Sequence, residues 1–174
     1  MHRLLLPAFA ALLLVIPPAS FAACGSPAFD LLENLAGRWE VSRNGQVIGR
    51  LTVQREAGEC ALLEKWEATD GVEAVAMHWT EPAADDKPDD GEPPARVLKQ
   101  VYVEDSGWVI EAEAYVENGA LVYEGPATVE GEDVVLRAVL HGLGTDRIVH
   151  VGDVSLDGGD TWRRIDSMVY RRID

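Results

Sequence analysis

Apolar and polar residues alternate along most of the chain after residue 36, which is the pattern of strands with one buried face. The segment 108–116 is the clearest case, because Trp108, Ile110 and the alanines at 112 and 114 fall on even positions while Glu111 and Glu113 fall on odd ones. Turn signals such as Asn44-Gly45 separate the alternating segments. The pattern predicts ten strands. Eight of them lie at 37–43, 47–55, 60–68, 72–80, 96–103, 108–116, 120–129 and 134–142. The last two form a closing hairpin within residues 147–172, with its turn at 157–160.

A short apolar segment at 29–35, which we expect to be helical, precedes the first strand, and no long helical pattern follows it. Consecutive strands joined by short turns predict an all-β fold, an antiparallel up-and-down barrel of about ten strands with a short N-terminal helix. Closure into a barrel removes the sheet edges that an open sheet would expose. A flattened sandwich of two sheets is the alternative. Gly125-Pro126 predicts an edge or a bulge in the strand at 120–129, because proline lacks an N–H.

The first 22 residues have the features of a secretory signal peptide. Arg3 precedes an apolar run at 4–16, and small residues around Ala22 are suited to cleavage. The run is too short to span a membrane, and no later stretch is apolar enough to do so. We therefore expect residues 1–22 to be a signal peptide and residues 23–174 to be a single exported domain, periplasmic or secreted, with room for a hydrophobic core.

The chain is strongly acidic, since its 174 residues include 30 Asp+Glu against 15 Lys+Arg and give a formal net charge of −15. Such a charge repels nucleic acid and anionic lipid surfaces, so neither is expected as a partner. The simplest explanation is solubility of an exported protein. Acidic residues and prolines concentrate at 81–94, which predicts a solvated loop, and the carboxylates there are not spaced as in a calcium-binding loop.

Two segments place charged residues on the predicted inner face. Lys65 and Glu67 should face water, which sends Glu64 and Trp66 inward. Pairing the closing hairpin across a tight turn at 157–160 puts charged and apolar side chains on one common face. These are Asp153, Trp162, Arg164, Asp166, Met168 and Tyr170. We expect this face to be the inner wall of the barrel, with Arg164 pairing with the two aspartates.

A wall of this kind predicts a lumen that binds a small, partly apolar molecule. The candidate ligand-binding residues are Glu64, Trp66, Gln100, Tyr102, Trp108, Trp162, Arg164 and Asp166. Three alternatives stay open. The polar residues form a structural network that fixes the strand register, Glu64 or Asp166 acts as a general acid or base on a substrate in the lumen, or a packed barrel meets a protein partner. A cavity of roughly several hundred Å³ would favour binding or catalysis over the protein partner.

The histidines raise the question of a metal or heme. Pairing across residues 142–146 predicts that His141 and His150 share a face that looks external, and the face of His78 is ambiguous. Two ligands without a third are not a zinc site, and heme would need a histidine that faces the lumen. No Gly-x-Ser-x-Gly motif is present either. We therefore assign no metal site, cofactor or catalytic residue.

Cys24 and Cys60 both lie in the part of the chain expected to be exported. An even number of cysteines in an oxidising compartment predicts one disulfide between them. The alternative is lipidation of Cys24, since Phe21-Ala22-Ala23-Cys24 is similar to a lipoprotein cleavage box. We favour the disulfide.

Several motifs resemble those of a known family. Gly37-x-Trp39 and Arg171-Arg172 are similar to the lipocalin-like (calycin) pattern, in which an arginine near the end of the barrel packs over the first-strand tryptophan. Three further blocks strengthen the likeness: Cys60-Ala61-Leu62-Leu63-Glu64-Lys65-Trp66, Gln100-Val101-Tyr102-Val103-Glu104 and Ser155-Leu156-Asp157-Gly158-Gly159-Asp160-Thr161-Trp162. Together they resemble an uncharacterised bacterial family of exported, lipocalin-like domains.

The resemblance covers most of residues 29–172, and it implies a lipocalin-like barrel more than an activity, because that family has no agreed one. The family's early cysteine supports the pairing of Cys24 with Cys60. Some positions depart from the family's pattern, since Leu98 and Gly152 stand where the family has tryptophan and His150 where it has glutamine.

Overall fold

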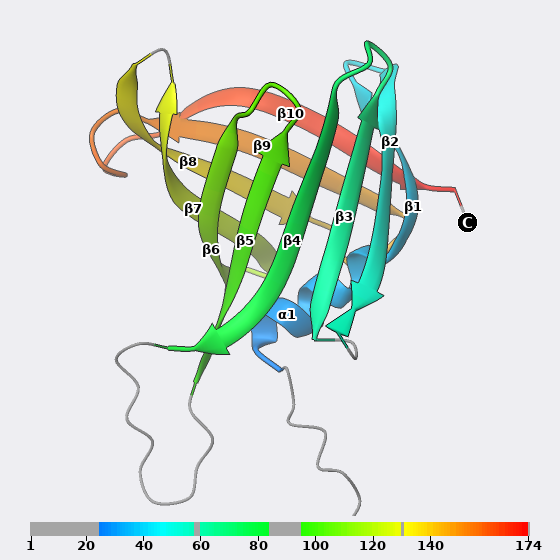
Figure 1. Ribbon diagram of the computed structural model, residues 1–174, viewed down its shortest axis with the longest axis horizontal. Coiled ribbons are helices and arrows are strands. Elements are labelled where there is room, and N and C mark those ends of the chain that lie inside the picture. The colour runs from blue at the N-terminus through cyan, green and yellow to red at the C-terminus, as the bar shows by residue number, and fades with distance from the viewer. Residues whose placement is uncertain (1–24, 58–59, 84–94, 130, 174) are drawn as a thin grey trace, which may run out of the picture.

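The chain forms a closed antiparallel barrel in the computed structural model, which describes residues 25–57, 60–83, 95–129 and 131–173 (Figure 1). Each strand pairs with its neighbours in sequence, and the first strand pairs with the last to close the barrel. The strands are β1 (Gly37–Arg43), β2 (Gln46–Glu56), β3 (Ala61–Ala68), β4 (Glu73–Pro82), β5 (Arg96–Glu104), β6 (Val109–Glu117), β7 (Ala120–Val129), β8 (Glu132–His141), β9 (Arg147–Ser155) and β10 (Arg163–Arg172). The prediction of an all-β, up-and-down barrel with a short N-terminal helix is therefore confirmed.

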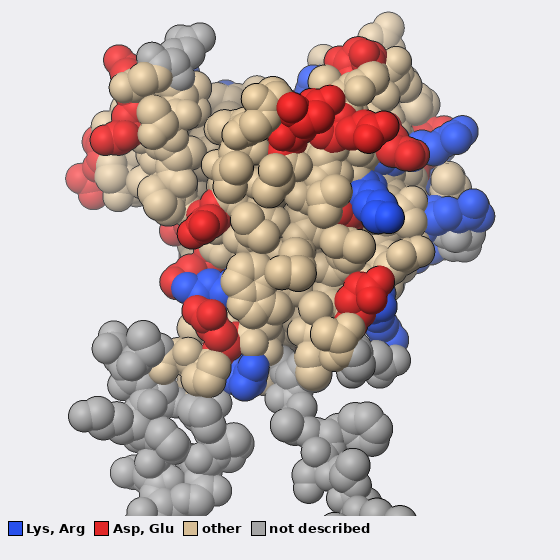
Figure 2. Space-filling model, viewed as in Figure 1, with Lys and Arg blue, Asp and Glu red and all other residues tan. Residues whose placement is uncertain are grey.

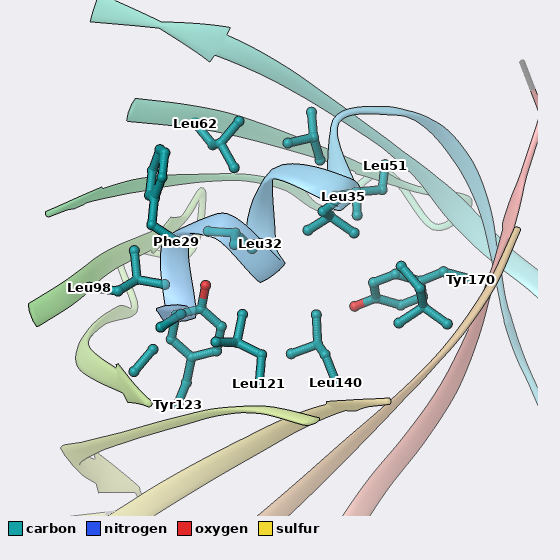
Figure 3. Close-up of a cluster of buried hydrophobic side chains, with 14 of the residues drawn as sticks. Phe29, Leu32, Leu35, Leu51, Leu62, Leu98, Leu121, Tyr123, Leu140 and Tyr170 are labelled. Carbon is teal, nitrogen blue, oxygen red and sulfur yellow. The ribbon is translucent and has the colours of Figure 1, made fainter. Parts of the chain in front are cut away.

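The N-terminal helix α1 (Pro27–Leu32) continues into the 3-10 turn η1 (Glu33–Leu35) and closes one end of the barrel (Figure 1). Ser26 caps the helix, because its Oγ accepts a hydrogen bond of 3.1 Å from the amide of Phe29. Proline fits the first helical position, where no amide partner is needed. The apolar side of the helix packs into the barrel against a ring of leucines (Figure 3), with Phe29, Leu32 and Leu35 meeting Leu51, Leu62, Leu98, Leu121 and Leu140.

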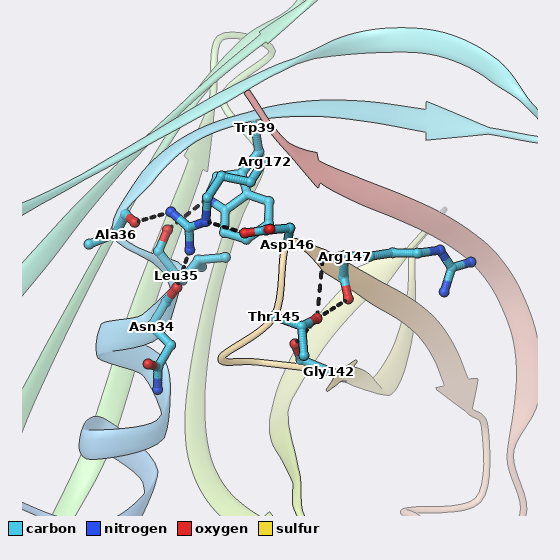
Figure 4. A network of polar contacts seen from close by, with 9 residues as sticks. All are labelled: Asn34, Leu35, Ala36, Trp39, Gly142, Thr145, Asp146, Arg147 and Arg172. Atoms are coloured by element: carbon cyan, nitrogen blue, oxygen red, sulfur yellow. Dashed lines mark hydrogen bonds and ion pairs between the residues drawn. The ribbon is translucent and has the colours of Figure 1, made fainter. Parts of the chain in front are cut away.

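Trp39 ties the first strand to the last at this closed end (Figure 4). Its side chain is fully buried, and its indole N–H donates to the carbonyl of Leu35 at 2.7 Å. The guanidinium of Arg172 lies 4.1 Å from the ring centroid and donates to the carbonyls of Ala36 and Asn34, both at 2.8 Å. The expected packing of an arginine from the end of the chain on Trp39 is therefore confirmed for Arg172.

The mouth of the barrel is the opposite end, where the connections β1–β2, β3–β4, β5–β6, β7–β8 and β9–β10 lie (Figure 1). Acidic side chains gather there over the ends of β3 to β5 (Figure 2). Glu73 and Asp105 are neighbours in this group, since the amide of Asp105 donates to the Glu73 carbonyl at 2.9 Å. Among the described residues, no helix is long and apolar enough to cross a membrane.

The connection between β9 and β10 is wider than the tight turn at 157–160 that we expected. β9 ends at Ser155 and β10 begins only at Arg163. Side chains take over the hydrogen bonding between them, because Ser155 Oγ accepts from the Gly159 amide at 2.8 Å and Asp157 accepts from the amide and the hydroxyl of Thr161 at 2.9 and 2.6 Å. Local bonds of this kind compete with a strand ladder. The pairs expected next to the turn, between residues 155–156 and 161–162, are accordingly not formed, whereas the predicted pair of Asp153 with Arg164 is.

These bonds predict an unusually acidic Asp157. The hydroxyl of Thr161 is the main cause that lowers the pKa of Asp157 from 3.8 to about 2. A lowered folded-state pKa stabilises the turn above pH 3.8, and this contribution is lost as the pH falls through about 2. An NMR titration should therefore find the Asp157 midpoint near 2, and Thr161→Val should raise it. A wild-type midpoint near the ordinary value would contradict this hydrogen-bond pattern.

A β-bulge in β10 changes which residues face the lumen. Arg164 pairs with Asp153 as predicted, but both Ile165 and Asp166 then lie opposite Gly152. The extra residue reverses the alternation along the rest of β10. Asp166 therefore faces the lumen with Gly152, whereas Arg164 and Asp153 belong to the alternate row. The expectation that Arg164 and Asp166 share one face is wrong for this reason.

Cys60 directly precedes β3, whereas Cys24 lies outside the described residues, as do the signal-peptide residues 1–22 and the loop residues 84–94. The disulfide between the two cysteines therefore stays a prediction. Closing a loop of about 35 residues should stabilise the fold by roughly 3–4 kcal/mol in the chain-entropy model. Intact mass after alkylation, with and without reductant, tests the bond, and a diacylglyceryl mass on Cys24 would show lipidation instead.

Candidate functional site

The barrel contains a cavity of about 380 Å³. Leu32 and Leu35 from the N-terminal helical segment form its floor, and it extends toward the mouth, where Glu104 and Trp108 line it. Most of the lining is apolar, and a few polar side chains interrupt it. A cavity of this size and character lies within the range that binds small molecules.

Six of the eight candidate ligand-binding residues line this cavity, namely Glu64, Trp66, Gln100, Tyr102, Trp108 and Asp166. Four of the six, Glu64 and Trp66 on β3 and Gln100 and Tyr102 on β5, face the cavity because side chains along these strands alternate between the inner and the outer face. No bulge interrupts the pairing of the two strands with β4. The structure thus gathers residues from β3, β5, β10 and the β5–β6 connection around one space.

Trp162 and Arg164 do not line the cavity, contrary to our expectation. The Trp162 ring lies 4.0 Å from the guanidinium of Arg137, and Arg164 Nε donates to Asp153 Oδ1 at 2.9 Å. The register aligns Arg164, Asp153 and Arg137 in one cross-strand row, of which Arg137 and Asp153 also border the cavity and Arg164 does not. Their shared role is a charged network between β8, β9 and β10, with the Arg164 side chain 61% exposed.

Glu64 takes part in a buried hydrogen-bonded chain with two residues that sequence reasoning missed. His78 Nε2 lies 3.2 Å from Glu64 Oε2, and His78 Nδ1 lies 2.9 Å from the hydroxyl of Tyr123. A carboxylate oxygen accepts, so His78 Nε2 donates to Glu64, and in the tautomer with its proton on Nε2 the Nδ1 atom accepts from the Tyr123 hydroxyl. The chain runs from Tyr123 through His78 and holds the Glu64 carboxylate in one position.

The pairing of β4 with β3 could have shown that His78 faces the lumen. Hydropathy along β4 misleads, because its small or polar residues are buried while the larger apolar residues Val75 and Met77 are exposed. Pairing β4 with β3 resolves this ambiguity, because Trp66 lies opposite Ala74 and Glu64 opposite Ala76. Extending the pairing by two residues places His78 on the face of Glu64.

His150 also lines the cavity, and its predicted external position is wrong. It pairs with Leu140, while the exposed His141 lies on the alternate row opposite Val149. The His150 ring stacks on Tyr170, with centroids 5.9 Å apart and planes at 10°. Burial lowers the pKa of His150, which keeps the ring neutral, although Glu64 and Asp166 oppose this effect. Its Nδ1 has no hydrogen-bond partner within the described part of the chain.

Three tyrosine hydroxyls of the lumen stay protonated. Burial raises the pKa of Tyr123 and of Tyr170 well above 10.0, and it raises that of Tyr102 to about 12. The charge of Glu64 acts in the same direction on all three, although burial has the larger effect on each and the charge of Glu104 comes before that of Glu64 for Tyr102. Glu64 is therefore the carboxylate around which the polar groups of the lumen are arranged.

The aromatic wall is supported by a glycine. A Cβ at Gly49 would lie 2.6 and 2.8 Å from two ring atoms of Trp66 and 2.5 Å from the Glu67 carbonyl oxygen. The absence of a side chain there lets the indole lie directly against β2. On the same wall, Tyr102 and Trp108 meet edge to face, with ring centroids 6.1 Å apart. Edge-to-face packing of this kind stabilises aromatic pairs.

Within the ranges that the structure describes, no group of three or more His, Cys, Asp or Glu is arranged to hold a metal ion. Comparison of the sequence with protein-family models gives no match, and comparison with curated proteins gives no significant one. The function is therefore argued from the geometry of the cavity.

Proposed function

We propose that the protein binds a small, partly apolar molecule inside the barrel. The observation that carries this proposal is the cavity of about 380 Å³, with Trp66 and Trp108 in its wall and Glu64 held in place within it. Protein interiors are close-packed, and a void of this size costs stability unless something uses it. A barrel that acted only through its outer surface would have no need of the cavity.

We further propose that the domain is exported and lipocalin-like. Export rests on the signal-peptide features of residues 1–22. The lipocalin-like relation rests on the motifs around Trp39 and at the end of the chain, and the contact between Trp39 and Arg172 is in keeping with it. A binder that works outside the cytoplasm fits an acidic chain with two cysteines.

Catalysis by Glu64 is the second candidate function. The contact between Glu64 and His78 favours it, because a carboxylate joined to an imidazole can move a proton to or from a bound substrate. Asp166 is the less suitable candidate for this role, since Arg43 already binds its carboxylate at 2.7 Å. Turnover of the molecule found in the cavity would distinguish an enzyme from a binder.

Native mass spectrometry of the protein purified from its own host tests the binding function. We expect a retained small molecule that dissociates on denaturation. Glu64→Gln preserves the shape of the side chain but removes its charge, so it should lower the retained fraction while leaving the melting temperature nearly unchanged. Glu113→Gln is the matched control, because this carboxylate pairs with Lys99 and its side chain is 64% exposed. A bare protein in all samples would count against the proposal.

A further inference from the structure

The charges that line the cavity do not balance. Two arginines and four carboxylates line it, namely Arg43, Arg137, Glu64, Glu104, Asp153 and Asp166. Each arginine is already engaged, since Arg43 lies 2.7 Å from Asp166 and Arg137 lies 3.5 Å from Asp153. Both guanidinium groups that line the cavity are therefore already paired with carboxylates, and the buried Arg137 Nε, which has no hydrogen-bond partner among the described residues, leaves room for an acceptor atom of a ligand as well.

Glu64 and Glu104 are the two carboxylates that remain. Glu64 is bonded to His78, and Glu104 accepts from the hydroxyl of Ser106 at 2.7 Å. Neither has a lysine or arginine within ion-pair distance in the described ranges. Glu64 is largely removed from water, with its side chain 16% exposed, whereas Glu104 lies nearer the solvent, and a carboxylate away from bulk water is stabilised by an opposite charge. A ligand with a positive charge would supply the charge that no lysine or arginine of the described residues brings to Glu64.

His150 adds a second, independent sign that something polar belongs in the cavity. Its ring is buried against Tyr170, and Nδ1 lacks a partner among the described residues. Buried polar atoms are nearly always hydrogen-bonded, and an exception indicates a missing ligand or water. A neutral imidazole nitrogen can accept a hydrogen bond from an ammonium group.

The aromatic residues of the wall suit the same kind of ligand. Trp66, Tyr102, Trp108 and Tyr170 all line the cavity that holds Glu64. The faces of such rings attract cations, and tryptophan does so most strongly. Aromatic rings combined with a carboxylate are the usual means by which proteins bind organic ammonium groups.

The mouth of the barrel favours entry of a cation. Acidic side chains gather over the ends of β3 to β5, as Figure 2 shows, and they include the exposed Asp70, Glu73 and Asp105. Together with the formal net charge of −15, this field raises the local concentration of cations at the mouth and repels anions.

From these observations, and resting on the proposed function, we infer that the lumen binds a small organic cation, an amine whose ammonium group meets Glu64 and whose apolar part lies along the aromatic wall.

Three probes that differ mainly in charge test this inference. Phenethylammonium, 2-phenylethanol and phenylacetate have similar shapes and are positive, neutral and negative at pH 7. Isothermal titration at constant ionic strength should give phenethylammonium a dissociation constant at least about tenfold below that of the alcohol, and phenylacetate the weakest binding. Glu64→Gln should reduce the preference for the amine over the alcohol to less than about threefold, whereas Glu113→Gln should keep it.

A neutral apolar dye, N-phenyl-1-naphthylamine, tests whether the lumen binds small apolar molecules at all, independently of any preference for a cation. Fluorescence enhancement of the dye reports access to the lumen, and Gly152→Trp, which adds an indole to the lining, should abolish it. If the dye binds but the amine is not preferred, or if the preference survives Glu64→Gln, the cation inference is overturned and lumen binding stands. If neither the dye nor any of the three probes binds, both proposals fall.

Discussion

Replacing Trp39 by alanine is expected to lower the free energy of unfolding by about 3–5 kcal/mol, the usual cost of deleting a large buried aromatic side chain. Trp39 joins three parts of the chain at the closed end of the barrel (Figure 4). It packs under Arg172 from β10, and its indole N–H holds the end of η1 through the carbonyl of Leu35. Removal of the ring would also leave the Arg172 guanidinium with nothing to pack against.

Thermal denaturation measures this effect, and for a domain of this size the expected loss is roughly 6–20 °C in melting temperature. Trp39→Phe is the matched control, because it keeps a ring under Arg172 while it loses the bond to Leu35 and part of the buried volume of the indole. It should cost much less than alanine. Arg172→Met tests the other half of the contact, since it removes the two bonds to Ala36 and Asn34. A melting temperature of Trp39→Ala equal to that of the wild type would show that this end of the barrel is not closed by the tryptophan.

The strands were predictable because alternation and turn residues act locally. A strand with one buried face must alternate, and short turns with glycine or asparagine force neighbouring strands to pair. Trp66 and Tyr102 reached the cavity as predicted because their strands pair with β4 without a bulge. For these two strands, parity along the sequence was sufficient to tell the inner face from the outer one, whereas in β4 the exposed Val75 and Met77 hid it.

In the closing hairpin, the alternation of residues along the sequence does not predict which side chains face the lumen. The bulge at Ile165 inserts one residue opposite Gly152, and no turn or periodicity signal in the sequence marks it. One extra residue is enough to move Asp166 into the lumen and separate it from Arg164. The wider connection after Ser155 has a similar origin, because side-chain bonds of Asp157 replace the expected backbone pairs.

The polar centre of the lumen needed tertiary information. His78 and Tyr123 lie on strands that are far apart in sequence, and only closure of the barrel brings them within 2.9 Å. His150 required the register across the β8–β9 connection, where it pairs with Leu140. Once these partners are known, Glu64 is no longer an isolated carboxylate beside Trp66 but the end of a buried hydrogen-bonded chain.

The final prediction concerns the charged network around Asp153, whose side chain is only 8% exposed. Arg164 Nε donates to Asp153 Oδ1 at 2.9 Å, and Arg137 Nη2 lies 3.5 Å from Oδ2. Because Asp166 is bound by Arg43, loss of Arg164 alone does not leave two aspartates facing each other. Either arginine can compensate the carboxylate, so Arg137→Met and Arg164→Met should each cost only about 1 kcal/mol.

The double variant Arg137→Met/Arg164→Met should behave differently, because it leaves a buried carboxylate with no cation beside it. We expect it to lose about 3–5 kcal/mol, well beyond the sum of the single changes, and urea denaturation of the four proteins in the cycle measures this coupling. Adding Asp153→Asn to the double variant removes the charge and should recover part of the stability. Strict additivity, or no recovery with asparagine, would mean that the two arginines stabilise the barrel through packing, for instance of Arg137 on Trp162, and not through the charge of Asp153.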